Sequence, residues 1–519
     1  MRKLLLTLIS VVALAALVGC GGGSSSNNNV SVPSAPSGGL HVGFSNSSLH
    51  GNYVFSVHGF NSSSSFAVSG LFTADGSGNI SSGIRDTVND AGGQNLGESI
   101  TGTYAVNSDG RGLAILNGSS GQSIYFLVLS SPSAGQLFQD GTGSNSIAAD
   151  AVGKLELQTS TSTALSGTYV VRLDGEDSNK FPYGAVGGLT ASGATLTGSI
   201  DENDAGTFSS QLAISSGTYT LSSNGRGTAT YTTPAGPNTG AHNFIVYYVS
   251  PSELELISTD KKFFLYGHAD QQLSGVGTLS GNQVFKISGF DNSGPSGSGY
   301  PIVETGRFSP SGGVLSSSSS IMDYNAQSSF YSPTFTGSYS VTSSGRWAAS
   351  LSNFSIGPLV NENLVGWQVS PQQSEVLVTY GSNSTLGTNY TVVATGDVQS
   401  QNVGLSNASV TGYYSQFFSG YDTGLGNFES TGGYQADGSG SLNGTIDFQT
   451  DSQGLAQNVA ESGETYSVDP ILGRGTATVS GVPVFFYTGI TSVLNNDTIY
   501  LISSDASSAY QGTLTLQQP

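Results

Sequence analysis

Residues 51–58 read GNYVFSVH, and the pattern of this stretch recurs along the chain. Apolar Tyr53, Phe55 and Val57 alternate with mostly polar neighbours, which gives the stretch a period of two. Such alternation is typical of a strand with one buried and one exposed face. The stretch therefore predicts a β-strand that follows a glycine.

Four diverged copies of one unit make up the chain. Each copy opens on a glycine just ahead of its first strand, at Gly51, Gly167, Gly281 and Gly412. A second glycine is followed by a tyrosine in mid-unit, at Tyr104, Tyr219, Tyr339 and Tyr466. A Gly-Arg pair comes shortly afterwards, with the arginines Arg111, Arg226, Arg346 and Arg474. The copies predict four modules, at residues 49–159, 160–272, 273–401 and 402–519.

Turn residues divide the first copy into eight short strand-like segments between Tyr53 and Gln158. Parallel strands need crossovers of a dozen residues or more, and these connections are too short. We therefore predict an all-β protein with four tandem antiparallel meanders of about eight strands each. A unit of about 115 residues is too long for one propeller blade of roughly 40 to 50 residues.

Each meander could close into a small barrel or form a two-sheet sandwich. Closure removes the sheet edges that charged residues otherwise protect, and charged residues are only 9% of this chain, so the barrel is favoured. An eight-stranded barrel is either filled by side chains or holds one small ligand, as in lipocalins and streptavidin. This likeness concerns the fold only.

The third copy departs most from the repeat pattern. In it Gln283 replaces the opening tyrosine and Trp347 replaces a glycine, so we expect local distortion there.

The N-terminus has the pattern of a secretory signal. Arg2 and Lys3 precede an apolar run at residues 4–18, and Cys20 is the only cysteine. The end of this run resembles the lipobox of bacterial lipoproteins, in which the cysteine is acylated and the chain is cut just before it. The resemblance implies a signal peptide at residues 1–19 and a lipid anchor on Cys20.

Residues 20–48 are rich in Gly, Ser and Asn and predict a flexible tether behind the anchor. Gly21 stands where an aspartate favours retention in the inner membrane in the lipoproteins that the chain resembles. The resemblance therefore implies an outer-membrane or cell-surface lipoprotein. The repeat pattern also looks like that of predicted bacterial lipoproteins with no assigned activity.

Composition excludes one class of partner. The chain has 34 acidic and 14 basic residues and a net charge of −20, so it repels phosphate backbones and we predict no nucleic-acid binding. Its 24 tyrosines and 24 phenylalanines supply the apolar surface that folded cores need.

The four Gly-Arg arginines allow two hypotheses. In the first, a type I′ hairpin turn such as Asp109-Gly110 precedes each arginine, which opens the next strand and pairs with a carboxylate or covers a rim. In the second, each arginine is an anion site. We favour the structural role for Arg111, Arg226, Arg346 and Arg474.

Other motifs are weaker. Loops at Asp75 and Asp437 resemble calcium loops, but the other copies keep the turn and lose the ligands. The five histidines show no ligand spacing. Glu253 and Glu255 share a strand face and could act as paired carboxylates, although a solvated face is the simpler interpretation. We therefore predict no catalytic residues, no metal and no cofactor.

These features favour a non-catalytic, membrane-anchored surface lipoprotein with a structural, adhesion or interaction role. Its partner could be the envelope, a polysaccharide or a protein. One alternative is small-ligand binding inside the barrels, and a second is an enzyme that acts on polysaccharide. The interior volume of the barrels distinguishes the first alternative from the leading hypothesis.

Cys20→Ser should abolish lipidation and release the protein into the soluble fraction, because no acyl chain would remain to hold it at the membrane. Detergent phase separation of cell extracts measures this, with Ser24→Ala in the tether as the control. Unchanged partitioning of the Cys20→Ser protein would contradict a lipid anchor.

Overall fold

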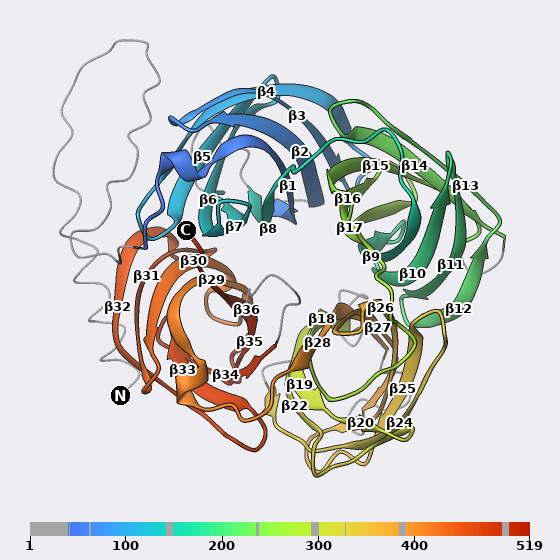
Figure 1. The fold of residues 1–519 in the computed structure, drawn as a ribbon, viewed down its shortest axis with the longest axis vertical. Coiled ribbons are helices and arrows are strands. Elements are labelled where there is room, and N and C mark those ends of the chain that lie inside the picture. Colours follow the sequence, from blue (N-terminus) through green and yellow to red (C-terminus); the bar gives the residue numbers. More distant parts are fainter. Residues whose placement is uncertain are drawn as a thin grey trace. The chain divides into compact units, whose positions relative to one another are not determined.

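The computed structural model describes residues 40, 42–61, 64–141, 149–234, 238–291, 300–326, 329–383, 391–489 and 498–519. Met1–Pro33 and Ser34–Pro519 are separate units, and the account below concerns the second. The predicted signal peptide, Cys20 and most of the tether lie outside the described residues. Within the described ranges the chain is all-β, with four antiparallel sheets, as predicted (Figure 1). No described helix has the length and hydrophobicity to cross a membrane.

Module 1 is a closed barrel of eight strands, coloured blue to teal in Figure 1. It closes because the first strand pairs with both the second and the eighth. All eight strands predicted for this copy are present. They are β1 (His50–Asn61), β2 (Ser65–Asp75), β3 (Asn79–Asn89), β4 (Gln94–Val106), β5 (Arg111–Gly118), β6 (Gly121–Ser131), β7 (Ala134–Gln139) and β8 (Ala149–Leu157).

Module 4 closes in the same order, since its first strand also pairs with its second and its eighth. Its strands are β29 (Thr411–Asp422), β30 (Gly426–Asp437), β31 (Ser441–Thr450), β32 (Gly454–Val468), β33 (Arg474–Val479), β34 (Val482–Thr488), β35 (Thr498–Ser503) and β36 (Ser508–Leu516).

Module 2 has nine strands because the counterpart of the long β4 is divided into two strands, β12 and β13. The barrel closes through pairing of β10 with β11 and a single pair between Thr195 and Thr218. Its strands are β9 (Gly167–Asp177), β10 (Pro182–Ser192), β11 (Thr195–Asp204), β12 (Thr207–Ile214), β13 (Ser216–Leu221), β14 (Arg226–Thr233), β15 (Gly240–Ser250), β16 (Glu253–Ser258) and β17 (Phe263–Gln271).

Module 3 departs from a closed barrel. Its eleven strands form one sheet, and the two strands at the ends of that sheet do not pair with each other. Residues 316–320 separate β21 from β22, and Pro333, which has no N–H to donate, lies between β23 and β24. The strands are β18 (Asn282–Asp291), β19 (Tyr300–Phe308), β20 (Pro310–Ser311), β21 (Val314–Leu315), β22 (Ile321–Ala326), β23 (Ser329–Tyr331), β24 (Thr336–Val341), β25 (Arg346–Ser352), β26 (Leu359–Ser370), β27 (Gln373–Asn383) and β28 (Val392–Gln401).

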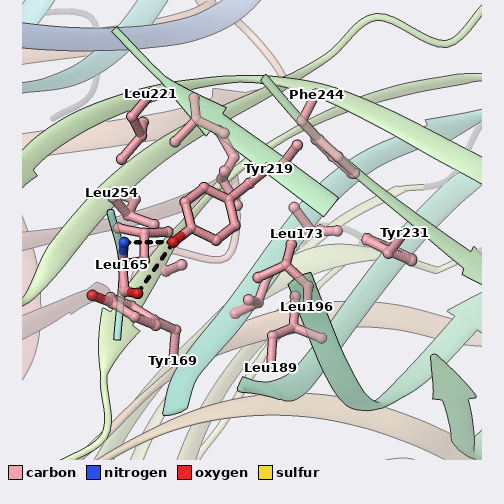
Figure 2. Close-up of a pocket in the computed structure, with 15 residues that line it drawn as sticks. Leu165, Tyr169, Leu173, Leu189, Leu196, Tyr219, Leu221, Tyr231, Phe244 and Leu254 are labelled. Atoms are coloured by element: carbon pink, nitrogen blue, oxygen red, sulfur yellow. Dashed lines mark hydrogen bonds between the residues drawn. The ribbon is translucent and has the colours of Figure 1, made fainter. Parts of the chain in front are cut away.

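Apolar side chains fill the interiors of the first two modules. Tyr53, Phe55 and Val57 are each 1% exposed in the core of module 1, which confirms the alternation predicted for residues 51–58. The cavity left in that core measures about 10 Å³, and the one in module 2 about 40 Å³ (Figure 2). A cavity that accepts benzene measures about 150 Å³, so neither interior has room for an organic ligand.

The mid-unit tyrosines hold the chain that enters each barrel. The Tyr104 hydroxyl donates a hydrogen bond to the Leu49 carbonyl at 2.7 Å, and the Tyr466 hydroxyl lies 2.6 Å from the carbonyl of Val410. In module 2 the Tyr219 hydroxyl contacts the backbone of Leu165 (Figure 2). This shared contact gives the second repeat marker a structural role.

Residues 42–48, which the sequence predicted to be part of a tether, pack against module 1. Phe44 is only 3% exposed in the core of module 1, where Val42 also packs. The backbone N–H groups of Val42, Gly43 and Phe44 point to the carbonyl of Ser108 at 3.0–3.2 Å. Residues 42–48 therefore belong to the first barrel, and the two apolar side chains in an otherwise polar run are the reason.

Trp347 fits its module because its cross-strand partner has also changed. In module 4 Gly475 lies opposite Phe486, whereas in module 3 Trp347 lies opposite Gly366. A Cβ at Gly366 would lie 2.1 Å from the Trp347 indole. The large and small partners have exchanged strands, so this substitution conserves the packed volume.

Trp347→Gly should destabilise the protein by about 3 to 5 kcal/mol, because it removes a fully buried indole and leaves a cavity. Adding Gly366→Phe should recover part of this loss, since the pair then matches the one in module 4. Denaturant unfolding of the full chain measures both variants. If the double variant is no more stable than Trp347→Gly, the exchange of partners is not what conserves the packing.

Candidate functional site

The four repeat arginines open strands β5, β14, β25 and β33. The turn before each is not the type I′ turn predicted. At residues 107–110 only Gly110 has a positive φ, of 86°, and its N–H bonds to the Asn107 carbonyl. A type I turn followed by a left-handed glycine has this pattern, whereas a type I′ turn needs two residues with positive φ.

Three of these arginines reach an aspartate in the preceding module. Arg226 binds Asp86 with its Nη2 at 2.7 Å from Oδ1 and its Nε at 2.8 Å from Oδ2. The corresponding shortest contacts are 2.8 Å from Arg346 to Asp201 and 2.5 Å from Arg474 to Asp323. The side chains of all three aspartates are 0% exposed. These bidentate pairs are charge-assisted and geometrically specific, which suits them to fixing one module on another.

An aromatic residue completes each of these contacts. The residues opposite the three arginines on the next strand are Tyr247, Trp367 and Tyr487. The indole Nε1 of Trp367 donates to Asp201 at 2.9 Å, and the hydroxyl of Tyr487 donates to Asp323 at 2.7 Å. Tyr247 donates to Asp86 in the same way. Each aspartate thus accepts bonds from two side chains of the following module.

The fourth arginine closes the series of contacts. Arg111 of module 1 binds Asp447 of module 4 through Nη1 at 3.0 Å, and its Nε binds Asp109 at 2.9 Å. The residue opposite Arg111 is Val128, which has no donor to offer. The buried Nη2 of Arg111 makes no hydrogen bond. The contact between modules 4 and 1 thus also joins an arginine to an aspartate, but it has fewer hydrogen bonds than the other three contacts.

A glutamine at the end of the last strand of each module, or directly after it, repeats the connection. Gln158 donates to the Tyr248 carbonyl at 2.7 Å, and Gln272 donates to the Gln368 carbonyl at 2.8 Å. Gln401 donates to the Gly473 carbonyl at 3.4 Å. At the end of the chain, Gln517 of module 4 donates to the Leu129 carbonyl of module 1 at 2.8 Å. Within Ser34–Pro519 the modules therefore contact one another in a closed cycle, from first to fourth and back to first.

The predicted pair Glu253 and Glu255 belongs to an ion cluster. The Lys154 ammonium lies 2.6 Å from Glu253, 2.7 Å from Glu255 and 3.1 Å from Glu156. Burial and the carboxylate of Glu253 raise the pKa of Glu156 well above its usual value. One ammonium is shared by three carboxylates, an arrangement unlike the acid pair that flanks the bond cleaved by a glycosidase.

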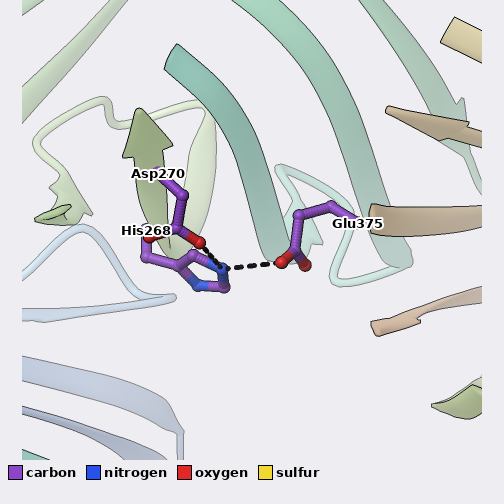
Figure 3. A group of neighbouring side chains, drawn as sticks. All are labelled: His268, Asp270 and Glu375. Carbon is purple, nitrogen blue, oxygen red and sulfur yellow. Dashed lines mark ion pairs between the residues drawn. The ribbon is translucent and has the colours of Figure 1, made fainter. Parts of the chain in front are cut away.

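A second group lies between β17 of module 2 and β27 of module 3 (Figure 3). The Nε2 of His268 is 3.6 Å from an oxygen of Asp270 and 3.4 Å from Oε1 of Glu375. Burial lowers the pKa of His268, but the carboxylates of Glu375 and Asp270 together outweigh this effect and the pKa rises to about 9. Burial raises the pKa of Asp270 to about 7. Sequence spacing missed this group because its residues come from two modules.

The two calcium-like loops are hairpin turns whose carboxylates are already engaged. Asp75 accepts the backbone N–H groups of Ser77 and Asn79 at 2.7 and 3.0 Å. Asp437 accepts the N–H groups of Ser439 and Ser441 at 2.7 and 2.9 Å. These hydrogen bonds stabilise the turns, and this structural role explains why an aspartate stands at each position.

The aspartates that pair with the arginines were also missed by sequence reasoning. They occupy one equivalent position, on the third strand of each copy or its counterpart, at Asp86, Asp201, Asp323 and Asp447. Alignment of the four copies to one another would have identified an aspartate that every unit keeps. The pairing across modules has no signal in the spacing along the chain.

Comparisons with known proteins give weak likenesses. No family model and no curated protein matches the chain. Among solved structures, a protein with unknown function from Nostoc punctiforme is 9% identical and covers 45% of this chain and 96% of its own, with a TM-score of 0.17. Transferrin binding protein B from Neisseria meningitidis is 10% identical and covers 75% and 85%, with a TM-score of 0.19. The same protein from Haemophilus parasuis is 11% identical and covers 74% and 82%, with a TM-score of 0.17. Such low TM-scores support no inference, so we take neither fold nor function from these proteins.

Arg226→Ala should lower the stability of the full chain by about 3 to 5 kcal/mol, because it leaves the buried carboxylate of Asp86 without its cation. Lys180→Ala is the matched control. It breaks a bridge from module 2 to Asp90 of module 1 in which Lys180 is 54% exposed, and should cost at most about 1 kcal/mol. Denaturant titration followed by circular dichroism measures both.

Equal, small effects of the two substitutions would contradict a structural role for the repeat arginines. A thermal shift of the unmodified protein with sulfate or phosphate, lost in Arg226→Ala, would instead support the anion-site hypothesis.

Proposed function

We propose that the protein is a non-catalytic lipoprotein of the bacterial cell surface with a structural, adhesive or protein-binding role. In this proposal Cys20 carries the lipid, the residues that follow it form the tether, and the four modules act outside the membrane as one unit. The envelope, a polysaccharide or another protein is the partner.

The closed cycle of buried ion pairs carries this proposal. Arg226, Arg346 and Arg474 each satisfy a fully buried aspartate of another module, and Arg111 joins the last module to the first. Separation of any two neighbours would expose or orphan these charges, which is costly. A body held together in this way presents a fixed outer surface, and that property suits a scaffold or an adhesin.

The filled interiors support an outer surface as the place of binding. Cavities of about 10 and 40 Å³ in modules 1 and 2 are too small for the apolar ligand that a carrier barrel would hold. The geometry therefore disfavours the small-ligand alternative for these two modules. The ion pairing of Glu253 and Glu255 with Lys154 likewise gives no support to a polysaccharide-acting enzyme.

Antibodies against the folded modules should label intact cells as strongly as permeabilised cells, because the proposal places the modules outside the outer membrane. Cells that carry Cys20→Ser are the control and should lose the surface signal. Labelling that requires permeabilisation would contradict surface display. Native mass spectrometry of the purified protein adds a second test, since a co-purified apolar small molecule would favour the carrier alternative.

A further inference from the structure

We propose that His268, Asp270 and Glu375 bind one divalent transition-metal ion, with zinc the best fit, and that this ion joins module 2 to module 3. His268 and Asp270 lie on β17, and Glu375 lies on β27 (Figure 3). The donor atoms lie within 4.8 Å of one another.

Two of the three separations between donor atoms match tetrahedral zinc. Zinc bonds of about 2.0 to 2.2 Å to nitrogen and oxygen place neighbouring ligand atoms about 3.3 to 3.6 Å apart. The observed separations from His268 Nε2 are 3.6 Å to Asp270 and 3.4 Å to Glu375. A direct hydrogen bond would bring these atoms to about 2.7 to 3.2 Å, so the group is more open than a hydrogen-bonded one.

Glu375 brings a buried carboxylate to the group. Glu375 is 0% exposed. The carboxylate oxygen nearest His268, Oε1, accepts no hydrogen bond. A buried carboxylate oxygen is costly unless a cation faces it, and Oε1 faces the imidazole of His268 at 3.4 Å. The other oxygen, Oε2, is held by the Arg172 guanidinium at 2.8 Å. Arg172 thus orients the carboxylate in the way that outer residues orient metal ligands. A metal ion bound between Oε1 and the Nε2 of His268 would take the place of the proton in this ion pair.

The charges around the group favour a divalent cation. With the group's own Asp270 and Glu375, seven carboxyl groups and three basic side chains lie together here, and a doubly charged ion would reduce this excess of acidic groups. The carboxyl groups are those of Glu156, Asp174, Glu253, Glu255, Asp270, Glu375 and Asp397, and the basic side chains are those of Lys154, Arg172 and Lys286.

Access and selectivity are consistent with this site. His268 and Asp270 are 14% and 18% exposed, so an ion can reach them from solvent. The neighbouring group of Glu156, Glu253 and Glu255 is a poorer candidate because the Lys154 ammonium already occupies its centre. Imidazole with two carboxylates suits zinc, whereas calcium prefers a larger set of oxygens. Three protein ligands leave the fourth zinc position to water.

Isothermal titration of the EDTA-treated, dialysed full chain with zinc chloride tests the proposal. We expect saturable binding of one ion, and a weakening of at least about tenfold in His268→Ala and in Glu375→Gln, because each removes a direct ligand. His50→Ala removes an exposed histidine of module 1, and Glu362→Gln removes a buried carboxyl group whose partner is Glu304, so both should bind zinc normally.

Titration of the unmodified chain with cobalt(II) gives a second readout that does not depend on any variant folding. The visible absorption of tetrahedral cobalt should appear and saturate at one equivalent, and zinc should displace it. Absence of saturable binding in both titrations would overturn the proposal and leave His268 as a protonated partner of the two carboxylates. Equal loss in the His50→Ala control would overturn it as well.

Discussion

The contact between a repeat arginine and an aspartate of the preceding module determines how the four sheets are joined. The aspartates are fully buried by this contact, so each carboxylate depends on a guanidinium that another module supplies. Buried ion pairs add little stability compared with apolar packing, but breaking one is expensive. Their main effect here is specificity, since a bidentate pair tolerates one orientation of two neighbouring sheets.

The local architecture could be read from the sequence because it depends on short-range patterns. Alternation at Tyr53, Phe55 and Val57 identified the first strand, and the repeat markers identified the number of sheets. The division of the fourth strand of module 2 and the open sheet of module 3 were not predictable, because both depend on bulges and loop geometry. Phe44 was assigned to the tether because its neighbours are polar.

The candidate sites could be predicted only in part. The turn before Arg226 marks where the arginine begins a strand, but its partner Asp86 is on another module and has no sequence pattern that points to Arg226. His268 and Glu375 meet for the same reason, through the assembly of modules. Contacts of this kind follow from how whole sheets pack, which alternation and spacing do not encode.

The arginine and aspartate faces have a further consequence for self-association. They form a heterologous contact, in which one surface of a unit binds a different surface of the next. Repetition of such a contact produces either a closed assembly or an endless filament. Because Gln517 and Asp447 contact module 1, each of the four arginine and aspartate faces in the described ranges is occupied by another part of the same chain. Fusion of four units into one polypeptide thereby provides closure, and the described residues leave no unpaired face of this kind to which another copy could add and start a fibre.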